Sequence, residues 1–151
     1  MKFKLKAQNL LEAIGMLFNL VPRPLIDTQV AFNAARVVMA AANTGLFEAM
    51  GKTGNTAKEL AEKTGTNEAA IKKLLDCLVS MDYVRYSNNT YQLRRGYYKW
   101  LLPDSPTNLL AKLRFQQKEW NWMAGLEDYI REGRIIDIHS NLTEQEWADY
   151  Q

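Results

Sequence analysis

The sequence predicts a mainly α-helical fold built around a winged helix, meaning a helix-turn-helix unit followed by a β-hairpin wing. Residues 55–80 have the pattern of two short helices separated by a tight turn at Gly65. A polar hairpin pattern follows at residues 83–93. The segments on either side of this unit also have helical patterns, so the fold class is mainly α with one small hairpin.

Length and composition fit one globular domain. The chain has 151 residues, of which 47% are hydrophobic and 24% charged, and a formal net charge of +2. A charge this close to neutral indicates neither nucleic acid nor a membrane as partner. No apolar run approaches the ~20 residues that span a bilayer, and no secretory signal follows the basic residues 1–6. The single cysteine, Cys77, reads as a buried apolar residue in a reducing compartment, so we expect a cytoplasmic protein.

Two helices are expected before the winged helix. Residues 8–19 carry one apolar face, and Pro22 and Pro24 stop that helix. The next helix is expected to start near Asp27 or Thr28 and to continue to about Asn43. Its middle, residues 34–42, is apolar almost all the way round. A helix without a polar face is expected to be buried on every side.

The winged helix has clear start and stop signals. Thr56 and Glu59 have the spacing of a capping box, and Gly65 closes the first helix. Thr66 or Asn67 then caps the second helix. The hairpin is expected to turn at residues 87–89, because asparagine tolerates the left-handed backbone of a tight turn.

A long helix is predicted from about Thr107 to Arg131, and it carries two apolar stripes. One comprises Leu109, Leu113, Trp120, Met123 and Ile130; the other comprises Phe115, Trp122, Leu126 and Tyr129. One domain cannot easily cover both sides of an outer helix, so the second stripe favours a surface for another subunit, another domain or a ligand. The alternative is that this helix lies centrally in the core.

The end of the chain opens another helix. Thr143 and Glu146 have the spacing of a second capping box, and the chain stops at Gln151 without a helix stop signal. We therefore expect the natural protein to continue beyond Gln151.

No catalytic constellation is found in the sequence. The one histidine, His139, has neither a second histidine nor a cysteine nearby, so its pattern is not that of a metal site. No glycine-rich phosphate or dinucleotide loop occurs. We expect this chain alone to have no enzymatic activity and no cofactor of its own.

A winged helix can also bind DNA, with its second helix in the major groove. The exposed residues of that helix are Asn67, Glu68, Lys72, Lys73 and Asp76, in which acids balance the lysines. The wing is more basic, with Arg85, Arg94, Arg95 and Lys99 among Tyr86, Tyr91, Tyr97 and Tyr98. We favour a solvated wing with tyrosines packed under it, because a helix without net charge reads DNA poorly.

Several segments together resemble the N-terminal dimerisation domain of S-adenosylmethionine-dependent small-molecule O-methyltransferases. The matching segments are Ala41–Met50, Thr56–Ala61 with Thr64 and Gly65, Leu74–Val79, Tyr91–Leu93, and Ser105–Pro106 with the aromatic helix after it. The resemblance covers roughly residues 26–131. The chain departs from it at Met81–Tyr83, where such enzymes usually have a glycine, and at Arg94, where threonine is common. In such enzymes the catalytic methyltransferase domain would lie beyond the segment that this chain resembles.

The resemblance implies the following organisation. Residues 1–151 form a single N-terminal dimerisation domain, with an arm helix at 1–25, a winged-helix core at 26–102, and a long helix with the start of a linker at 103–151. The N-terminal helices interlock with a second subunit in a homodimer, and the long helix helps to cover the pocket of a small-molecule acceptor. A catalytic domain in cis binds S-adenosylmethionine.

Within that organisation, Phe115, Trp120 and Met123 are the candidate pocket-lining residues, and core packing is the alternative for each. The preferred function is thus the dimerisation and pocket-covering domain of an O-methyltransferase. A dimeric winged-helix DNA-binding regulator is the alternative from another class, and a stand-alone interaction domain is a third reading.

Overall fold

The computed structural model describes residues 7–135 and 142–150 of the chain. The described residues form two compact parts, one extending through Ala35 and the other beginning at Arg36. Helices dominate both parts, with a single antiparallel hairpin among the described residues, so the mainly α prediction is confirmed. The predicted domain boundaries at 25/26 and 102/103 stay predictions.

The first part contains α1 (Leu10–Leu17), α2 (Arg23–Leu25), the π-helical turn η1 (Ile26–Val30) and the start of α3 (Ala31–Asn43). Asn9 caps α1 by accepting from the Glu12 amide at 2.9 Å. The helix expected near Asp27 in fact begins at Arg23, because Pro24 occupies the first turn, where no backbone donor is needed. The Thr28 hydroxyl donates to the Pro24 carbonyl at 2.7 Å in the π-helical turn.

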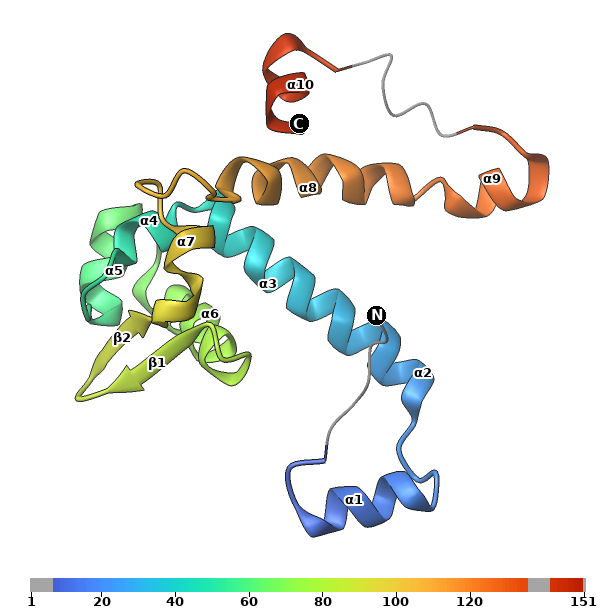
Figure 1. Ribbon diagram of the computed structural model, residues 1–151, viewed down its shortest axis with the longest axis horizontal. Helices are drawn as coiled ribbons and strands as arrows, with labels where there is room; N and C mark the ends of the chain where they lie inside the picture. Colours follow the sequence, from blue (N-terminus) through green and yellow to red (C-terminus); the bar gives the residue numbers. More distant parts are fainter. Residues whose placement is uncertain (1–6, 136–141, 151) are drawn as a thin grey trace. The chain divides into compact units, whose positions relative to one another are not determined.

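The second part holds the winged helix: α4 (Leu46–Met50), α5 (Ala57–Thr64), α6 (Glu68–Ser80), β1 (Val84–Ser87) and β2 (Thr90–Leu93). The elements that follow are η2 (Arg95–Tyr97), α7 (Tyr98–Leu101), α8 (Leu110–Met123), α9 (Leu126–Glu132) and α10 (Glu144–Tyr150). In Figure 1 the hairpin lies beside α5 and α6, with α7 following it.

Local signals determine the winged helix as predicted. Thr56 and Glu59 form both bonds of the capping box, and Gly65 ends α5 in the left-handed conformation. Asn67 caps α6. The hairpin pairs Val84 with Leu93 and turns on Asn88 and Asn89, whose φ angles are 49° and 57°.

The core lies between α3, α4, α5, α6 and the hairpin. Ala41, Ala42, Leu46, Phe47, Leu60, Leu75, Leu78 and Val84 are fully buried in it. Asn55, only 4% exposed, has all its polar atoms satisfied. Its amide donates to the carbonyls of Met50 and Thr53 at 3.0 Å, and its side-chain oxygen accepts from the Lys63 ammonium at 2.5 Å. Its backbone also pairs with Tyr91, which joins the loop before α5 to β2.

Three sequence expectations require correction. Cys77 is exposed, because α6 turns Ile71, Leu75 and Leu78 toward the core and residue 77 falls off that face. The helix expected over 107–131 is two helices, α8 and α9, separated at Ala124 and Gly125. It also begins later, because Ser105 and Thr107 both donate their hydroxyls to the Lys99 carbonyl and hold a turn there.

The third correction concerns α3. Its second half is buried at Val38, Met39, Ala41 and Ala42, but its first half is not, and Phe32 is 51% exposed. The prediction of burial on every side is therefore wrong for the single chain. Among the described residues, no helix combines the length and the apolar character that crossing a bilayer requires.

The departure from the family pattern after α6 has a structural explanation. Asp82 has a φ of 63°, the left-handed conformation that glycine adopts without strain and that aspartate tolerates. Its carboxylate pairs with the Arg94 guanidinium at 2.8 Å. Asp82 thus fills a glycine-like position and is held there from across the hairpin.

The contact between Tyr91 and Asp76 predicts a pH-dependent part of the stability. The Tyr91 hydroxyl donates to the Asp76 carboxylate at 2.8 Å, and this bond together with Lys72 holds the pKa of Asp76 below its usual value. A lowered pKa in the folded state stabilises the fold above the unfolded pKa, and this stabilisation is lost as pH falls through the folded pKa. Tyr91→Phe should cost about 1 kcal/mol at neutral pH and little at low pH.

The measurement is urea unfolding at a series of pH values from neutral to strongly acidic. Tyr86→Phe, in the same hairpin, is the control, because the Tyr86 hydroxyl bonds only the exposed Asn89. An equal loss of stability by Tyr91→Phe at every pH would contradict the role of Asp76.

Candidate functional site

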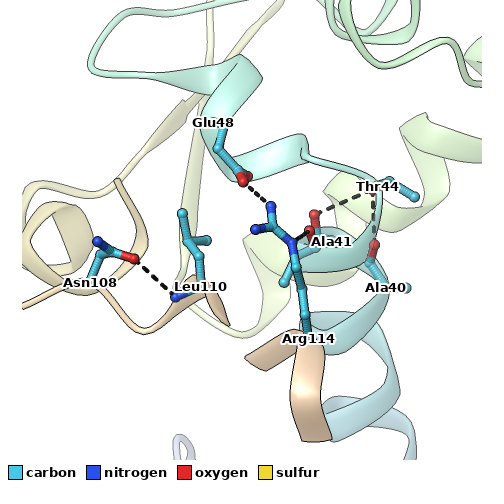
Figure 2. A network of polar contacts seen from close by, with 8 residues as sticks. Ala40, Ala41, Thr44, Glu48, Asn108, Leu110 and Arg114 are labelled. Atoms are coloured by element: carbon cyan, nitrogen blue, oxygen red, sulfur yellow. Dashed lines mark hydrogen bonds and ion pairs between the residues drawn. The ribbon is translucent and has the colours of Figure 1, made fainter. Parts of the chain in front are cut away.

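Helix α8 is fastened to the winged-helix core through Arg114. The Arg114 Nε donates to the Ala42 carbonyl at 3.2 Å, and its guanidinium pairs with Glu48. Figure 2 shows the guanidinium between Glu48 on α4 and the carboxyl end of α3. The second oxygen of Glu48, Oε2, is buried without a hydrogen-bond partner among the described residues. The carboxylate therefore depends on Arg114 for compensation of its charge.

The next two turns of α8 also contact α3. Arg36 on α3 donates to the Gln117 side chain and lies 5.7 Å from the centre of the Trp120 ring. Arg114, Gln117 and Trp120 are spaced three residues apart, so each lies about 60° around α8 from the one before. Successive turns of α8 thus use polar and cation–π contacts to lie against α3.

The three predicted pocket-lining residues do not lie together. Phe115 is only 6% exposed and packs edge-on against Trp122, with ring centres 5.7 Å apart. Trp120 lies at the contact with Arg36. Met123 is 56% exposed. At about 100° per residue, Trp120 and Met123 lie about 60° apart around α8, whereas Phe115 lies about 140° from Trp120.

An apolar hollow of ≈ 180 Å³ lies elsewhere in the same part of the molecule. It is lined by Val38, Tyr83, Tyr97, Trp100, Leu101, Leu109 and Leu113. The rings of Tyr83 and Tyr97 stack at 4.5 Å, and burial raises the pKa of Tyr83. Sequence reasoning missed this hollow, although it had placed Leu109 and Leu113 on one stripe. Phe115, Trp120 and Met123 are not among its lining residues.

Helix α10 packs against α8. The Lys118 ammonium pairs with the Glu146 carboxylate at 2.6 Å, while Glu146 also accepts from the amide and hydroxyl of Thr143. Lys118, followed by Thr143, lowers the pKa of Glu146 to about 2. The predicted second capping box is therefore present, and its carboxylate also docks the helix. His139, for which no metal role was expected, lies outside the described residues.

The first part of the chain exposes a large apolar surface within itself. None of the residues of α1 is buried, and Leu11 and Leu17 are 81% and 80% exposed. Further exposed apolar side chains in this part are Leu10, Phe18, Leu20, Leu25, Val30 and Phe32. Exposed apolar side chains in this number are typical of a segment that another molecule covers.

On α6, the helix that would enter the major groove of DNA, acidic residues offset part of the positive charge. On α6, Lys72 pairs with Asp76 at 3.0 Å, and Glu68 stands in the first turn. The wing tyrosines pack as expected: Tyr91 is buried, and Tyr86 lies over it at 4.6 Å. These features do not give α6 the positive surface of a recognition helix.

Comparison with known proteins gives a family and a fold. The family model described as O-methyltransferase dimerisation domain matches residues 26–99. No curated protein matches the sequence. The comparisons do not support the DNA-binding alternative.

Solved methyltransferase structures share the fold. An O-methyltransferase family protein from Burkholderia thailandensis is 16% identical, with a TM-score of 0.62, over 85% of this chain and 35% of its own. Human N-acetylserotonin methyltransferase, solved in complex with SAM, is 24% identical with a TM-score of 0.67, over 74% and 34%. The mitomycin 7-O-methyltransferase MmcR is 22% identical with a TM-score of 0.66, over 80% and 37%. The chain therefore spans about a third of the length of these proteins.

The contact between Arg114 and Glu48 can be tested by a double-mutant cycle. Arg114→Gln removes the partner of a partly buried carboxylate and a donor to the end of α3, so it should destabilise the fold by on the order of 1 kcal/mol. In a Glu48→Gln background the same change should cost clearly less. The measurement is the free energy of unfolding in urea.

Arg131→Gln on α9 is the matched control, because Arg131 is exposed. It should leave the free energy of unfolding within about 0.5 kcal/mol of the parent. Additive effects of Arg114→Gln and Glu48→Gln would show that the two residues do not act together.

Proposed function

Residues 26–99 belong to the O-methyltransferase dimerisation domain family, and from this we propose that the chain pairs two subunits of an O-methyltransferase and helps to cover its acceptor pocket. The whole enzyme would be a homodimer that methylates a small hydroxylated molecule with S-adenosylmethionine.

The observation that carries this proposal is the exposed apolar surface from α1 to the first half of α3. Leaving such side chains in water is unfavourable, since fully burying a leucine or phenylalanine contributes about 1.5–3 kcal/mol. The surface contains at least eight large apolar side chains that are half-exposed or more: Leu10, Leu11, Leu17, Phe18, Leu20, Leu25, Val30 and Phe32. A second copy of the chain is the covering molecule that the family description supports.

The cofactor would belong to the rest of the enzyme. The chain spans about a third of the similar methyltransferases, and one of these was solved with SAM. The present sequence has no glycine-rich loop for a nucleotide. We therefore assign S-adenosylmethionine to a catalytic domain in cis rather than to these residues.

The acceptor would meet the far end of α8. Trp120 and Met123 lie on neighbouring sides of that helix and come from the same predicted stripe. Met123 is largely exposed and Trp120 is partly exposed, so both can contact a further molecule. Phe115 is buried against Trp122, and its contribution would be to hold that ring in place.

The oligomeric state tests the pairing role. In solution the 151-residue chain should be a dimer by light scattering, and Leu11→Asp with Leu17→Asp should convert it to a monomer. Two charges in the apolar face of α1 cannot be buried without a large desolvation cost. Helicity by circular dichroism should stay close to that of the parent, because the substituted residues are outside the core.

Lys58→Asp on α5 is the control, since Lys58 is exposed and outside the proposed interface. It should leave the dimer intact. A parent chain that stays monomeric at high concentration would refute the pairing role.

The acceptor role is tested in the complete enzyme. Trp120→Ala should raise the KM for the acceptor about tenfold and leave the KM for S-adenosylmethionine unchanged, because one lost apolar contact affects acceptor binding alone. Trp147→Ala on α10 serves as the tryptophan control. Equal changes in both KM values would contradict a role of Trp120 that is confined to the acceptor.

A further inference from the structure

A basic groove runs beside the wing, and none of its lining residues belongs to the apolar surface on which the pairing proposal rests. This hollow of ≈ 720 Å³ is bounded by the base of the hairpin and by η2. Its charged lining consists of Arg85, Arg94, Arg95 and Asp82. Three positive charges against one negative charge leave the groove with a net charge of +2 (3 − 1 = 2).

The three guanidinium groups are engaged to different degrees. Arg94 is paired with Asp82 at 2.8 Å. Arg85 donates to the neutral side chain of Gln92 at 2.7 Å, which leaves its charge uncompensated. Within the described part of the chain, the Arg95 guanidinium has no hydrogen bond or ion pair, and the residue is exposed. The charges of Arg85 and Arg95 are therefore available to a partner, whereas the charge of Arg94 is compensated by Asp82.

The chemistry of the groove favours a partner that carries several anionic groups. Guanidinium forks match carboxylates and phosphates in bidentate geometry, so the choice between the two depends on the surroundings of the groove. Each exposed pair contributes only about 0.2–1 kcal/mol, so a single small anion would be held too weakly. Several carboxylates presented on one chain add their contributions without paying the association entropy again.

Duplex DNA fits the surroundings less well. A winged helix that reads DNA needs α6 as well as the wing to meet phosphates. Here α6 presents Glu68, and Asp76 occupies Lys72. An acidic protein segment that contacts the wing alone avoids these carboxylates.

We propose that the groove formed by Arg85, Arg94 and Arg95 is a docking surface for an acidic segment of another protein. Carboxylates of that segment pair with Arg85 and Arg95, and Asp82 limits the affinity by occupying Arg94. The surface is independent of the apolar face of α1 that the pairing function uses.

A labelled polyglutamate peptide is the probe, and fluorescence anisotropy with the full 151-residue chain at low ionic strength is the measurement. Arg85→Gln and Arg95→Gln should each weaken binding by up to about fivefold, the limit for an exposed pair. Asp82→Asn should strengthen binding by a similar factor, because it frees Arg94 and asparagine tolerates the left-handed backbone. Added salt should weaken all binding.

Two matched controls separate the groove from net charge. Arg131→Gln removes one positive charge from α9, and Glu62→Gln removes one negative charge from the exposed face of α5; both should leave the affinity unchanged. Circular dichroism and thermal melting show whether each variant is folded. The proposal is overturned if the controls change affinity as much as the groove variants, or if Asp82→Asn weakens binding while remaining folded. It is also overturned if a labelled DNA duplex binds more tightly than the peptide at the same ionic strength.

Discussion

The cost of leaving apolar side chains in water governs both parts of this chain, with opposite results. In the winged-helix part, residues from the helices α3 to α8 and the hairpin bury one another, so that side chains such as Phe47 and Leu75 have no exposed surface. In the first part, α1 has an apolar face and no buried residue. The winged-helix part therefore buries its apolar side chains within one chain. Another surface that covered this apolar face would stabilise the first part, so this region is the best candidate for subunit pairing.

The winged helix could be predicted because its determinants are local. A capping box, a left-handed glycine and two turn asparagines each act within a few residues, and each forms as expected. The break between α8 and α9 was missed, since the apolar pattern continues across Ala124 and Gly125. The exposure of Cys77 was missed because it depends on how α6 is rotated against the core. Local patterns do not contain that information.

The candidate site could be predicted only in part. The two stripes on residues 107–131 led to the candidate residues of α8, and their role in a pocket stays a prediction; Phe115 is buried and packs against Trp122. The contacts of Arg114 could not be predicted, because its partners Ala42 and Glu48 lie 72 and 66 residues earlier in the chain. The pairing of the wing arginines could not be predicted from the sequence either. Its arginines were visible in the sequence, yet only the structure separates Arg94, which is paired, from Arg95, which is not.

The dual role of Glu146 couples the start of α10 to its attachment to α8. One carboxylate both starts the helix, through Thr143, and attaches it to α8, through Lys118. If the first turn of α10 unwinds, the carboxylate is no longer positioned for the lysine; if the lysine leaves, the first turn loses the cation that favours the ionised carboxylate. Winding of the first turn and attachment to α8 therefore support each other, because both use the same carboxylate.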